Sequence, residues 1–233
     1  MRILVTRPRE DAERTAERLR ERGHVPLLAP VLEIVTTGTA PPVASPVAVI
    51  ITSGHAVGPA VAALSPHLPV FAVGERTAGV ARQAGFVQVE AAAGDARSLV
   101  GLMTERLPPG AQLLHARGRD SKPEPEASLT ARGFDVRPWI AYEARAAGAL
   151  PADAVDAIRA GTIDLALHYS RRSAEILLAL AARAGLALCL PRMRHVCLSA
   201  DVAEPLAAIG LDTAAADAPH EDRLLALLDI QSH

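Results

Sequence analysis

The stretch ILVTRPR at residues 3–9 sets the pattern of the chain, because a related stretch, LLHARGR, occupies residues 113–119. In each stretch a short apolar run leads into two arginines separated by one residue. Four matched pairs share an offset of 110 residues: Arg7 and Arg117, Arg9 and Arg119, Gly23 and Gly133, and Glu33 and Glu143. Matches at one fixed offset indicate an internal repeat.

Two further segments are repeated later in the chain. VAVIITSGHAVGPAV at residues 47–61 parallels IDLALHYSRRSAEIL at 163–177, and a shift of one residue between the two windows places Ser53 opposite Ser170. FAVGERTAGVARQAGF at residues 71–86 parallels VCLSADVAEPLAAIGL at 196–211, with Gly85 opposite Gly210. We therefore interpret the chain as two copies of one structural unit.

Short apolar runs alternate with Ala/Leu/Arg segments of helical period throughout the chain. Strands are predicted at residues 3–5, 47–51, 70–73, 113–114, 163–167 and 195–198, and helices at 11–22, from about 54 to 64, from 74 to 85 and from 169 onward. Residues 25–35 are strand-like, with Pro26 and Pro30 indicating an edge strand or a connector. This alternation predicts an α/β fold whose parallel sheets are covered by helices.

The predicted strand-to-helix turns share hydroxyls, glycines and arginines. In open parallel sheets, ligands bind beyond the carboxyl ends of the strands, and helix N-termini attract carboxylates and phosphates. Taken singly, Ser53, Thr77 and Ser170 are explained equally well as helix caps. Six such turns together favour a large polyanionic ligand held between two domains.

Composition and motifs exclude several classes of protein. The net charge of −2 argues against a general nucleic-acid binder. Lys122 is the single lysine among 24 basic residues, a bias typical of GC-rich coding, so arginines, hydroxyls and backbone N–H groups must hold any anion. No dinucleotide fingerprint, P-loop, nucleophile elbow or metal-ligand spacing is present, so no metal site is predicted. The two cysteines, Cys189 and Cys197, are interpreted as packing residues.

Residues 34–74 contain no charged side chain, but prolines interrupt this stretch and it is not a membrane helix. The N-terminus leads directly into a strand without a signal-peptide pattern, so we expect a cytoplasmic protein that has no membrane contact.

The segments ILVTRP, PVLEI, VIITSGHAV, FAVGERTA, LLHARGRD, IAYE and YSRRSA, in this order, resemble the uroporphyrinogen-III synthase family of tetrapyrrole biosynthesis. The resemblance implies two similar flavodoxin-like or Rossmann-like domains joined by a two-stranded β linker. It places domain one at residues 1–35 and 146–233 and domain two at 36–145, with linker strands near 31–36 and 139–145.

The resemblance also implies the reaction. The family closes hydroxymethylbilane, a linear tetrapyrrole, to uroporphyrinogen III with loss of water and inversion of ring D, through an azafulvene cation and a spiro-pyrrolenine, without a cofactor. Tyr142 matches a family tyrosine, and its phenol can donate a hydrogen bond to the departing hydroxyl. An ordinary linker residue is an equally strong interpretation of Tyr142.

Binding residues follow from the matched turns and from local chemistry. The resemblance carries over Thr52, Ser53, Gly74, Arg76, Thr77, Gly118 and Ser170. Local chemistry adds Arg7, Arg117, Arg119 and Arg171, for each of which an ordinary surface arginine is as strong an interpretation. The second copy of VGERTA is LSADVA, in which Val202 replaces the threonine and Ser199 replaces the glycine. The hydroxyl contact there is therefore absent or comes from Ser199, and Asp201 would repel a carboxylate if it pointed inward.

Two alternatives stay open at the level of sequence. One is a non-catalytic two-domain α/β protein that binds a small ligand, and the other is an inactive homologue of the synthase. For the synthase we expect a monomer that can make a transient contact with the preceding pathway enzyme.

Overall fold

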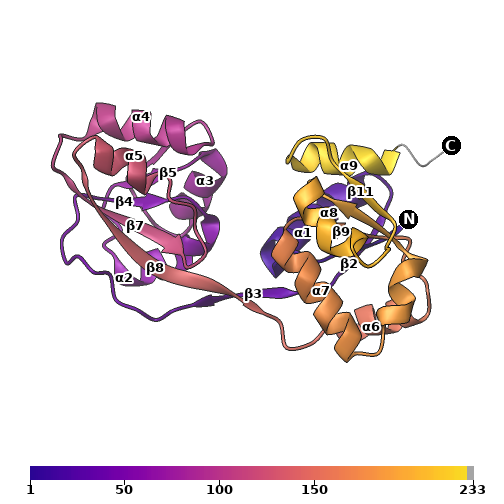
Figure 1. The fold of residues 1–233 in the computed structure, drawn as a ribbon. Coiled ribbons are helices and arrows are strands. Elements are labelled where there is room, and N and C mark those ends of the chain that lie inside the picture. Colours follow the sequence, from indigo (N-terminus) through magenta and orange to yellow (C-terminus); the bar gives the residue numbers. More distant parts are fainter. Residues whose placement is uncertain (230–233) are drawn as a thin grey trace. The chain divides into compact units, whose positions relative to one another are not determined.

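A computed structural model describes residues 1–229 of the chain (Figure 1). The chain divides into two compact units, which we call unit 1, Met1–Glu33 with Arg145–His233, and unit 2, Ile34–Ala144. That the predicted domains, residues 1–35 with 146–233 and residues 36–145, fold independently stays a prediction. Each unit is described by itself below.

Unit 2 contains a run of strands that alternate with helices. They are β4 (Ala48–Ile51), β5 (Val70–Ala72), β6 (Val89–Ala91), β7 (Gln112–Gly118) and β8 (Asp135–Ala146), with the helices η1 (Gly54–Ala56), α2 (Val57–Ala63), α3 (Glu75–Gln83), α4 (Ala96–Arg106) and α5 (Glu126–Ala131). The strands are ordered β8-β7-β4-β5-β6, and each pair in this order is parallel. The linker strand β3 (Leu32–Thr36) adds to β8.

Alternation of side chains along the strands of unit 2 produces two apolar layers. Val49 and Ile51 of β4 belong to a cluster with residues of α2 and with Ala81 of α3. Ala48 and Ile50 belong to a second cluster with residues of α4 and α5. Because successive side chains of a strand point to opposite faces, both faces of this sheet are buried by helices, as parallel sheets require.

Unit 1 has the same construction. Its strands are β1 (Arg2–Val5), β2 (Val25–Leu28), β9 (Leu165–His168), β10 (Arg194–Cys197) and β11 (Thr213–Ala215), and its helices are α1 (Arg9–Glu21), α6 (Ala152–Arg159), α7 (Arg171–Arg183), η2 (Ala187–Arg192), α8 (Ala200–Ala207) and α9 (Glu221–Asp229). The parallel sheet has the order β11-β10-β9-β1-β2. Read from β2, this is the flavodoxin-like order 2-1-3-4-5.

The two linker strands are β3 and the C-terminal part of β8. Ala147 N donates to Val31 O at 2.9 Å, and Thr37 N donates to Ala141 O at 3.1 Å. The partners move in opposite directions along the chain, so the strands are antiparallel. The predicted linker segments, 31–36 and 139–145, lie in these two strands.

Strand register supports the internal repeat more directly than sequence similarity does. The equivalent strands are β1 and β7, β2 and β8, β9 and β4, and β10 and β5, and with these pairs the two sheets have the same order. The residues paired across neighbouring strands also correspond between the units. In unit 1 the pairs are Arg2 with Val25, Ile3 with Leu165, and His195 with Ala166. The equivalent pairs in unit 2 are Gln112 with Asp135, Leu113 with Ala48, and Val70 with Val49. The α/β fold of two parallel-dominated sheets is confirmed.

Some local predictions needed correction. The strand-like run at residues 25–35 is two strands, β2 and β3, because Pro30 interrupts it; β2, which contains Pro26, lies at the sheet edge as expected. Helices α4, α6 and α9 and strands β6 and β11 were not predicted individually. Within residues 1–229, no helix is long and apolar enough to span a membrane.

Candidate active site

Parallel strands bring the predicted binding turns of unit 2 to one edge of its sheet. Because β4, β5, β7 and β8 run in the same direction, their carboxyl ends lie at the same edge. The residues that follow or end β4, β5 and β7 are Thr52 and Ser53, Gly74 to Thr77, and Arg117 to Arg119, and Tyr142 lies within β8 opposite Gly118, the last residue of β7. The strands of unit 1 are also parallel, so Arg7, Ser170, Arg171 and Ser199, which follow β1, β9 and β10, lie at the equivalent edge of its sheet.

Tyr142 is held on the backbone of Gly118. The two residues are paired across β7 and β8, where the register shifts after Arg117. A Cβ atom at Gly118 would lie 2.8 Å from two ring carbons of Tyr142, so a larger residue would displace the ring. The imidazole of His55 contacts the ring edge-on, with centroids 5.7 Å apart. Among residues 1–229 the Tyr142 hydroxyl makes no hydrogen bond, and it is therefore available to a ligand.

Thr52 belongs to a chain of polar contacts that leads into the core of unit 2. Its Oγ1 lies 3.2 Å from Nε2 of His115, and Nδ1 of His115 lies 2.8 Å from Oε1 of Glu126. Arg117 Nη1 donates to the same carboxylate oxygen at 2.6 Å. His115 is buried, and burial lowers the pKa of its imidazole despite the nearby Glu126. We call these four residues the Thr52–Arg117 chain.

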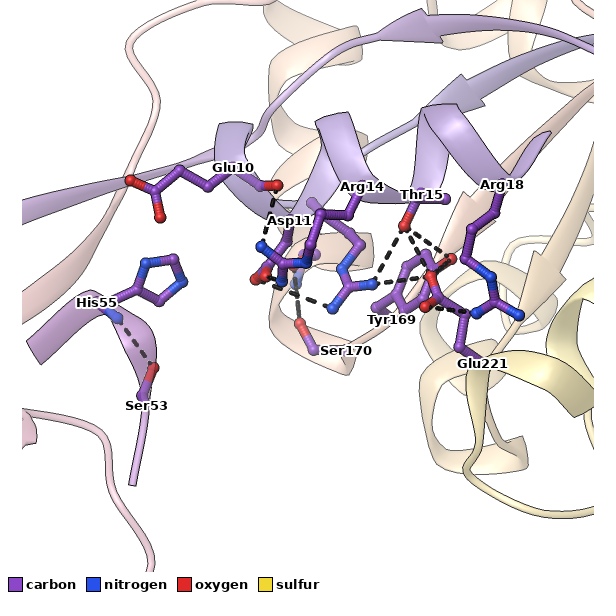
Figure 2. Close-up of polar contacts among 12 residues, drawn as sticks. Glu10, Asp11, Arg14, Thr15, Arg18, Ser53, His55, Tyr169, Ser170 and Glu221 are labelled. Carbon is purple, nitrogen blue, oxygen red and sulfur yellow. Dashed lines mark hydrogen bonds and ion pairs between the residues drawn. The ribbon is translucent and has the colours of Figure 1, made fainter. Parts of the chain in front are cut away.

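The remaining turns of unit 2 present helix N-termini. Ser53 caps η1 by accepting from His55 N at 3.4 Å (Figure 2), and Gly74 precedes α3 with extended backbone. A Cβ atom at Gly74 would lie 3.1 Å from Gly94 Cα, so this turn packs closely on its neighbour. Thr77 is buried, whereas Arg76 is exposed and makes no ion pair with any described residue. Arg76 is thus the available cation of this turn.

Arg119 at the end of β7 is exposed, and its Nε donates to Glu143 Oε2 at 2.6 Å. Its backbone N–H donates to Tyr142 O at 3.0 Å, which extends the pairing of the two strand ends.

In unit 1 the corresponding arginine, Arg7, belongs to an internal cluster of hydrogen bonds, of which Figure 2 labels Thr15, Arg18, Tyr169 and Glu221. Arg7 stacks on the ring of Tyr169, 4.1 Å from the ring centroid, and donates to Glu221 Oε1 at 2.9 Å. Thr15 and the Tyr169 hydroxyl each donate to the same oxygen at 2.7 Å, and Arg18 donates to Glu221 Oε2 at 2.9 Å. We call this set the Glu221 cluster; it fixes the start of α9.

Protonation in the Glu221 cluster follows from these contacts. Burial acts to raise the pKa of Glu221, but hydrogen bonds from Thr15 and Tyr169 and the charge of Arg7 outweigh it, so the pKa lies below its usual range. Burial, followed by the charge of Glu221, raises the pKa of the Tyr169 phenol. Glu221 is charged and Tyr169 is neutral at physiological pH.

Two helix N-termini of unit 1 carry the other predicted binding residues. Ser170 caps α7, accepting from Ser173 N at 3.1 Å. Arg171 is exposed and contacts Glu175 at 3.2 Å and Asp201 at 3.3 Å, and it also pairs with Glu204. Ser199 precedes α8 without a capping hydrogen bond from its side chain, and Val202 is buried. Asp201 of the divergent LSADVA loop therefore pairs with an arginine.

Several polar residues at these edges were missed from the sequence: His55, His115 and Glu126 in unit 2, and Tyr169 and Glu221 in unit 1. His115 had a usable signal, because it alternates with Leu113 on a buried strand and so had to point into the core. Glu221 had none, because it lies far along the chain from Arg7, Thr15 and Tyr169.

Two repeated flavodoxin-like units, each with hydroxyl, glycine and arginine turns at the carboxyl edge of its sheet, define an α/β protein suited to a ligand with many carboxylates. The family follows from the sequence: residues 13–226 match the family described as uroporphyrinogen-III synthase HemD. The chain belongs to the uroporphyrinogen-III synthase family. Among curated protein sequences there is no significant match.

Solved structures are similar to the chain over nearly its whole length. A uroporphyrinogen-III synthetase from Helicobacter pylori 26695 aligns with a TM-score of 0.64 and 16% identity, covering 99% of this chain and 100% of that chain. This likeness shows the shared fold. A mutant uroporphyrinogen III synthase from the extremely thermophilic bacterium Thermus thermophilus aligns with a TM-score of 0.47 and 17% identity, covering 98% and 96% of the two chains.

Proposed function

We propose that this chain is a catalytically active uroporphyrinogen-III synthase, a hydro-lyase that closes hydroxymethylbilane to uroporphyrinogen III. Water is lost and ring D is inverted in the step. Family membership supports the substrate and the reaction. The roles of individual residues are argued from the geometry of each unit.

Tyr142 carries the catalytic part of the proposal. Its phenol sits at the strand-end edge of unit 2, is held on Gly118 and has no hydrogen-bond partner among residues 1–229. A phenol is protonated at neutral pH and can assist departure of the terminal hydroxyl. The hydroxyl takes a proton from the phenol as the C–O bond breaks and leaves as water, and the bilane keeps the positive charge as an azafulvene cation. Ring closure then releases a proton, so the net change is loss of one water. Assistance of this kind contributes about 10²- to 10⁴-fold to a rate.

Conformational control is the second task of the protein. The cation is generated from the substrate itself, so the outcome depends on which carbon of the last ring faces it. Helix N-termini at Ser53, Gly74, Ser170 and Ser199 can hold substrate carboxylates through backbone N–H groups and hydroxyls. Restricting a flexible chain to one reactive conformation is worth several kcal/mol in favourable cases.

The arginines differ in how much they can contribute. Arg76 is exposed without an ion pair among the described residues, so it is the arginine best placed to bind a substrate carboxylate. Arg117, Arg119 and Arg171 are each paired with carboxylates, and a substrate would have to share their remaining N–H groups. Arg7 is stacked and paired within the Glu221 cluster, which favours a structural role.

Cytoplasmic location, a monomeric state and a transient contact with the preceding pathway enzyme complete the proposal. Gel filtration with light scattering tests the monomer, for which a mass near 24.4 kDa is expected.

The experiment that tests the function is a coupled assay supplied with freshly made hydroxymethylbilane, with separation of the type III and type I isomers. We expect type III product well above the uncatalysed background. Type I product alone, at the spontaneous rate, would show a non-catalytic binder or an inactive homologue.

A further inference from the structure

The Thr52–Arg117 chain contains a buried histidine that the proposed function does not use. His115 lies in β7 opposite Ile50 of β4, and both side chains point into the layer that α4 and α5 cover. A buried polar group is costly unless it is hydrogen-bonded. Both ring nitrogens of His115 have partners, Thr52 Oγ1 at 3.2 Å and Glu126 Oε1 at 2.8 Å.

The direction of each hydrogen bond follows from Arg117. A guanidinium can only donate, and Arg117 Nη1 donates to Glu126 Oε1 at 2.6 Å. Glu126 Oε1 is therefore an acceptor, and its contact with His115 Nδ1 at 2.8 Å is satisfied by a proton on Nδ1. Burial lowers the pKa of His115, and the groups that face the ring are Thr52, Glu126 and Arg117. The ring is neutral at pH 7, with its one proton on Nδ1, so Nε2 accepts a hydrogen bond.

Thr52 must then donate its single hydroxyl proton to Nε2 of His115. A threonine hydroxyl has one donor and two acceptor positions. Once the proton is directed into the core, the oxygen offers lone pairs alone to a ligand. Thr52 is partly exposed at the strand-end edge of unit 2, where a ligand can reach it. In this state it repels a carboxylate and accepts from an N–H group.

We propose that His115 is a positioning residue that makes Thr52 a hydrogen-bond acceptor for a pyrrole N–H of the bound tetrapyrrole, an inference that rests on the proposed function. It revises the sequence-based expectation that Thr52 holds a substrate carboxylate. The feature belongs to unit 2, because the equivalent positions in unit 1 are Tyr169 and Val5. A linear tetrapyrrole carries N–H donors along its centre and carboxylates on its rim, so one acceptor among anion-binding turns fixes which edge of a ring faces this strand end.

The first test is independent of activity. Nitrogen-15 NMR of the imidazoles in the full-length protein, assigned with His115→Phe, reports which nitrogen carries the proton. We expect His115 to be neutral at pH 7, with the proton on Nδ1 and a pyridine-type Nε2. A protonated Nε2, in either the neutral or the charged ring, would overturn the proposal.

The second test is a double-mutant cycle in the hydroxymethylbilane assay. Thr52→Val removes the acceptor and should raise KM about 3- to 10-fold, the range expected for one hydrogen bond, whereas Thr52→Ser should stay near wild type. His115→Phe should raise KM to a similar extent in the wild-type background and add nothing to Thr52→Val. In the control cycle, the effects of Ser53→Ala and His115→Phe should simply add.

The direction in which His115→Phe changes KM shows whether Thr52 contacts a pyrrole N–H or a carboxylate of the substrate. If Thr52 contacted a carboxylate, removing the histidine would free the hydroxyl proton to donate, and KM would fall. A lower KM, or an effect that persists undiminished in the Thr52→Val background, contradicts the proposal. If His115→Phe does not fold, a Thr52→Val KM equal to wild type overturns it instead. A wild-type protein that forms type I product alone refutes the proposed function but leaves the NMR result standing.

Discussion

In unit 1 the Tyr169 phenol donates to Glu221, whereas in unit 2 the Tyr142 phenol makes no hydrogen bond to any of residues 1–229. These are the two tyrosines of the chain, and both lie at carboxyl ends of strands in sheets of the same order and register. The Tyr169 hydroxyl is used within unit 1, whereas the Tyr142 hydroxyl can still donate a hydrogen bond to a ligand.

The difference has a local cause. Helix α9 begins with Glu221, whose carboxylate collects Arg7, Thr15, Arg18 and Tyr169. Helix α4, which follows β6 as α9 follows β11, begins with Ala96, and the carboxylate at its start, Asp95, caps its own helix by accepting from Ser98 N at 2.7 Å. Arg117, the counterpart of Arg7, is paired with Glu126 of α5 instead. The repeated fold therefore gives both units the same arrangement of strand ends. Single residues such as Glu221 determine whether the side chains there are hydrogen-bonded within the unit.

The largest expected difference between the units is their response to acid. His168 of unit 1 is fully buried beside His195, and burial lowers its pKa to about 3. An unfolded histidine has a pKa of about 6.5, so between these values the unfolded chain binds a proton that the folded chain does not. The free energy of unfolding should fall by about 1.4 kcal/mol per pH unit as pH drops through this window. The lowered pKa of Glu221 acts in the same direction below its usual range.

Two signals can follow this acid transition. Trp139, the single tryptophan, reports unit 2, and far-UV circular dichroism reports both units. We expect the circular dichroism to change at a higher pH than the Trp139 fluorescence. Denaturant unfolding of His168→Gln should show a shallower pH slope, and the exposed control His67→Gln should keep the wild-type slope. An unchanged slope in His168→Gln would contradict the assignment.

Gly118→Ala tests whether the position of the Tyr142 ring matters for catalysis. The added Cβ would lie 2.8 Å from the tyrosine ring and must displace it. Misplacement of a reacting group by about 1 Å can cost about 100-fold in rate, and we expect a loss of kcat of this order with circular dichroism unchanged.

The matched control for Gly118→Ala is Gly101→Ala in α4, where an added Cβ meets nothing within 4 Å. Its kcat should equal that of wild type, and its stability should rise slightly because alanine favours a helix. Equal kcat values for the two variants would show that the Tyr142 position does not matter.

Substitutions of the two exposed arginines at the unit 2 edge, Arg76 and Arg119, should have the smallest effects. Arg76→Ala removes one exposed cation from this edge and should raise KM about 2- to 5-fold with little change in kcat, since an exposed charge pair is worth at most about 1 kcal/mol. Arg119→Ala should raise KM less, because Glu143 already binds its guanidinium. The comparison is best made at low salt, and the Arg76 effect should shrink as ionic strength rises. A larger rise in KM for Arg119→Ala than for Arg76→Ala would show that Arg119, not Arg76, is the main carboxylate-binding arginine of this edge.

The backbone was largely predictable from the repeat. Matched glycines predicted equivalent turns, and Gly23 and Gly133 both adopt positive φ, 75° and 85°. Ser53 and Ser170 predicted helix starts, and both cap them. These features depend on neighbours in sequence, so local patterns were sufficient.

Pairings across the chain were not predictable. Arg7 and Glu221 are 214 residues apart, and no local pattern indicates that they meet. Tyr169 follows the buried strand β9 and Tyr142 lies within β8, and nothing in either segment indicates which phenol is occupied; Glu221 of α9, far along the chain, decides it. The family resemblance therefore points to Tyr142, and the hydrogen bonds of the structure show that Tyr169 is occupied by Glu221.

Turnover and thermal stability measured side by side for Tyr142→Phe and Tyr169→Phe test the central claim most directly. For Tyr142→Phe we predict a fall in kcat for type III product of about 100-fold or more and an unchanged Tm. For Tyr169→Phe we predict near-normal kcat and a loss of about 1–3 kcal/mol of stability, because Glu221 loses a buried donor. Wild-type turnover in Tyr142→Phe would contradict the account.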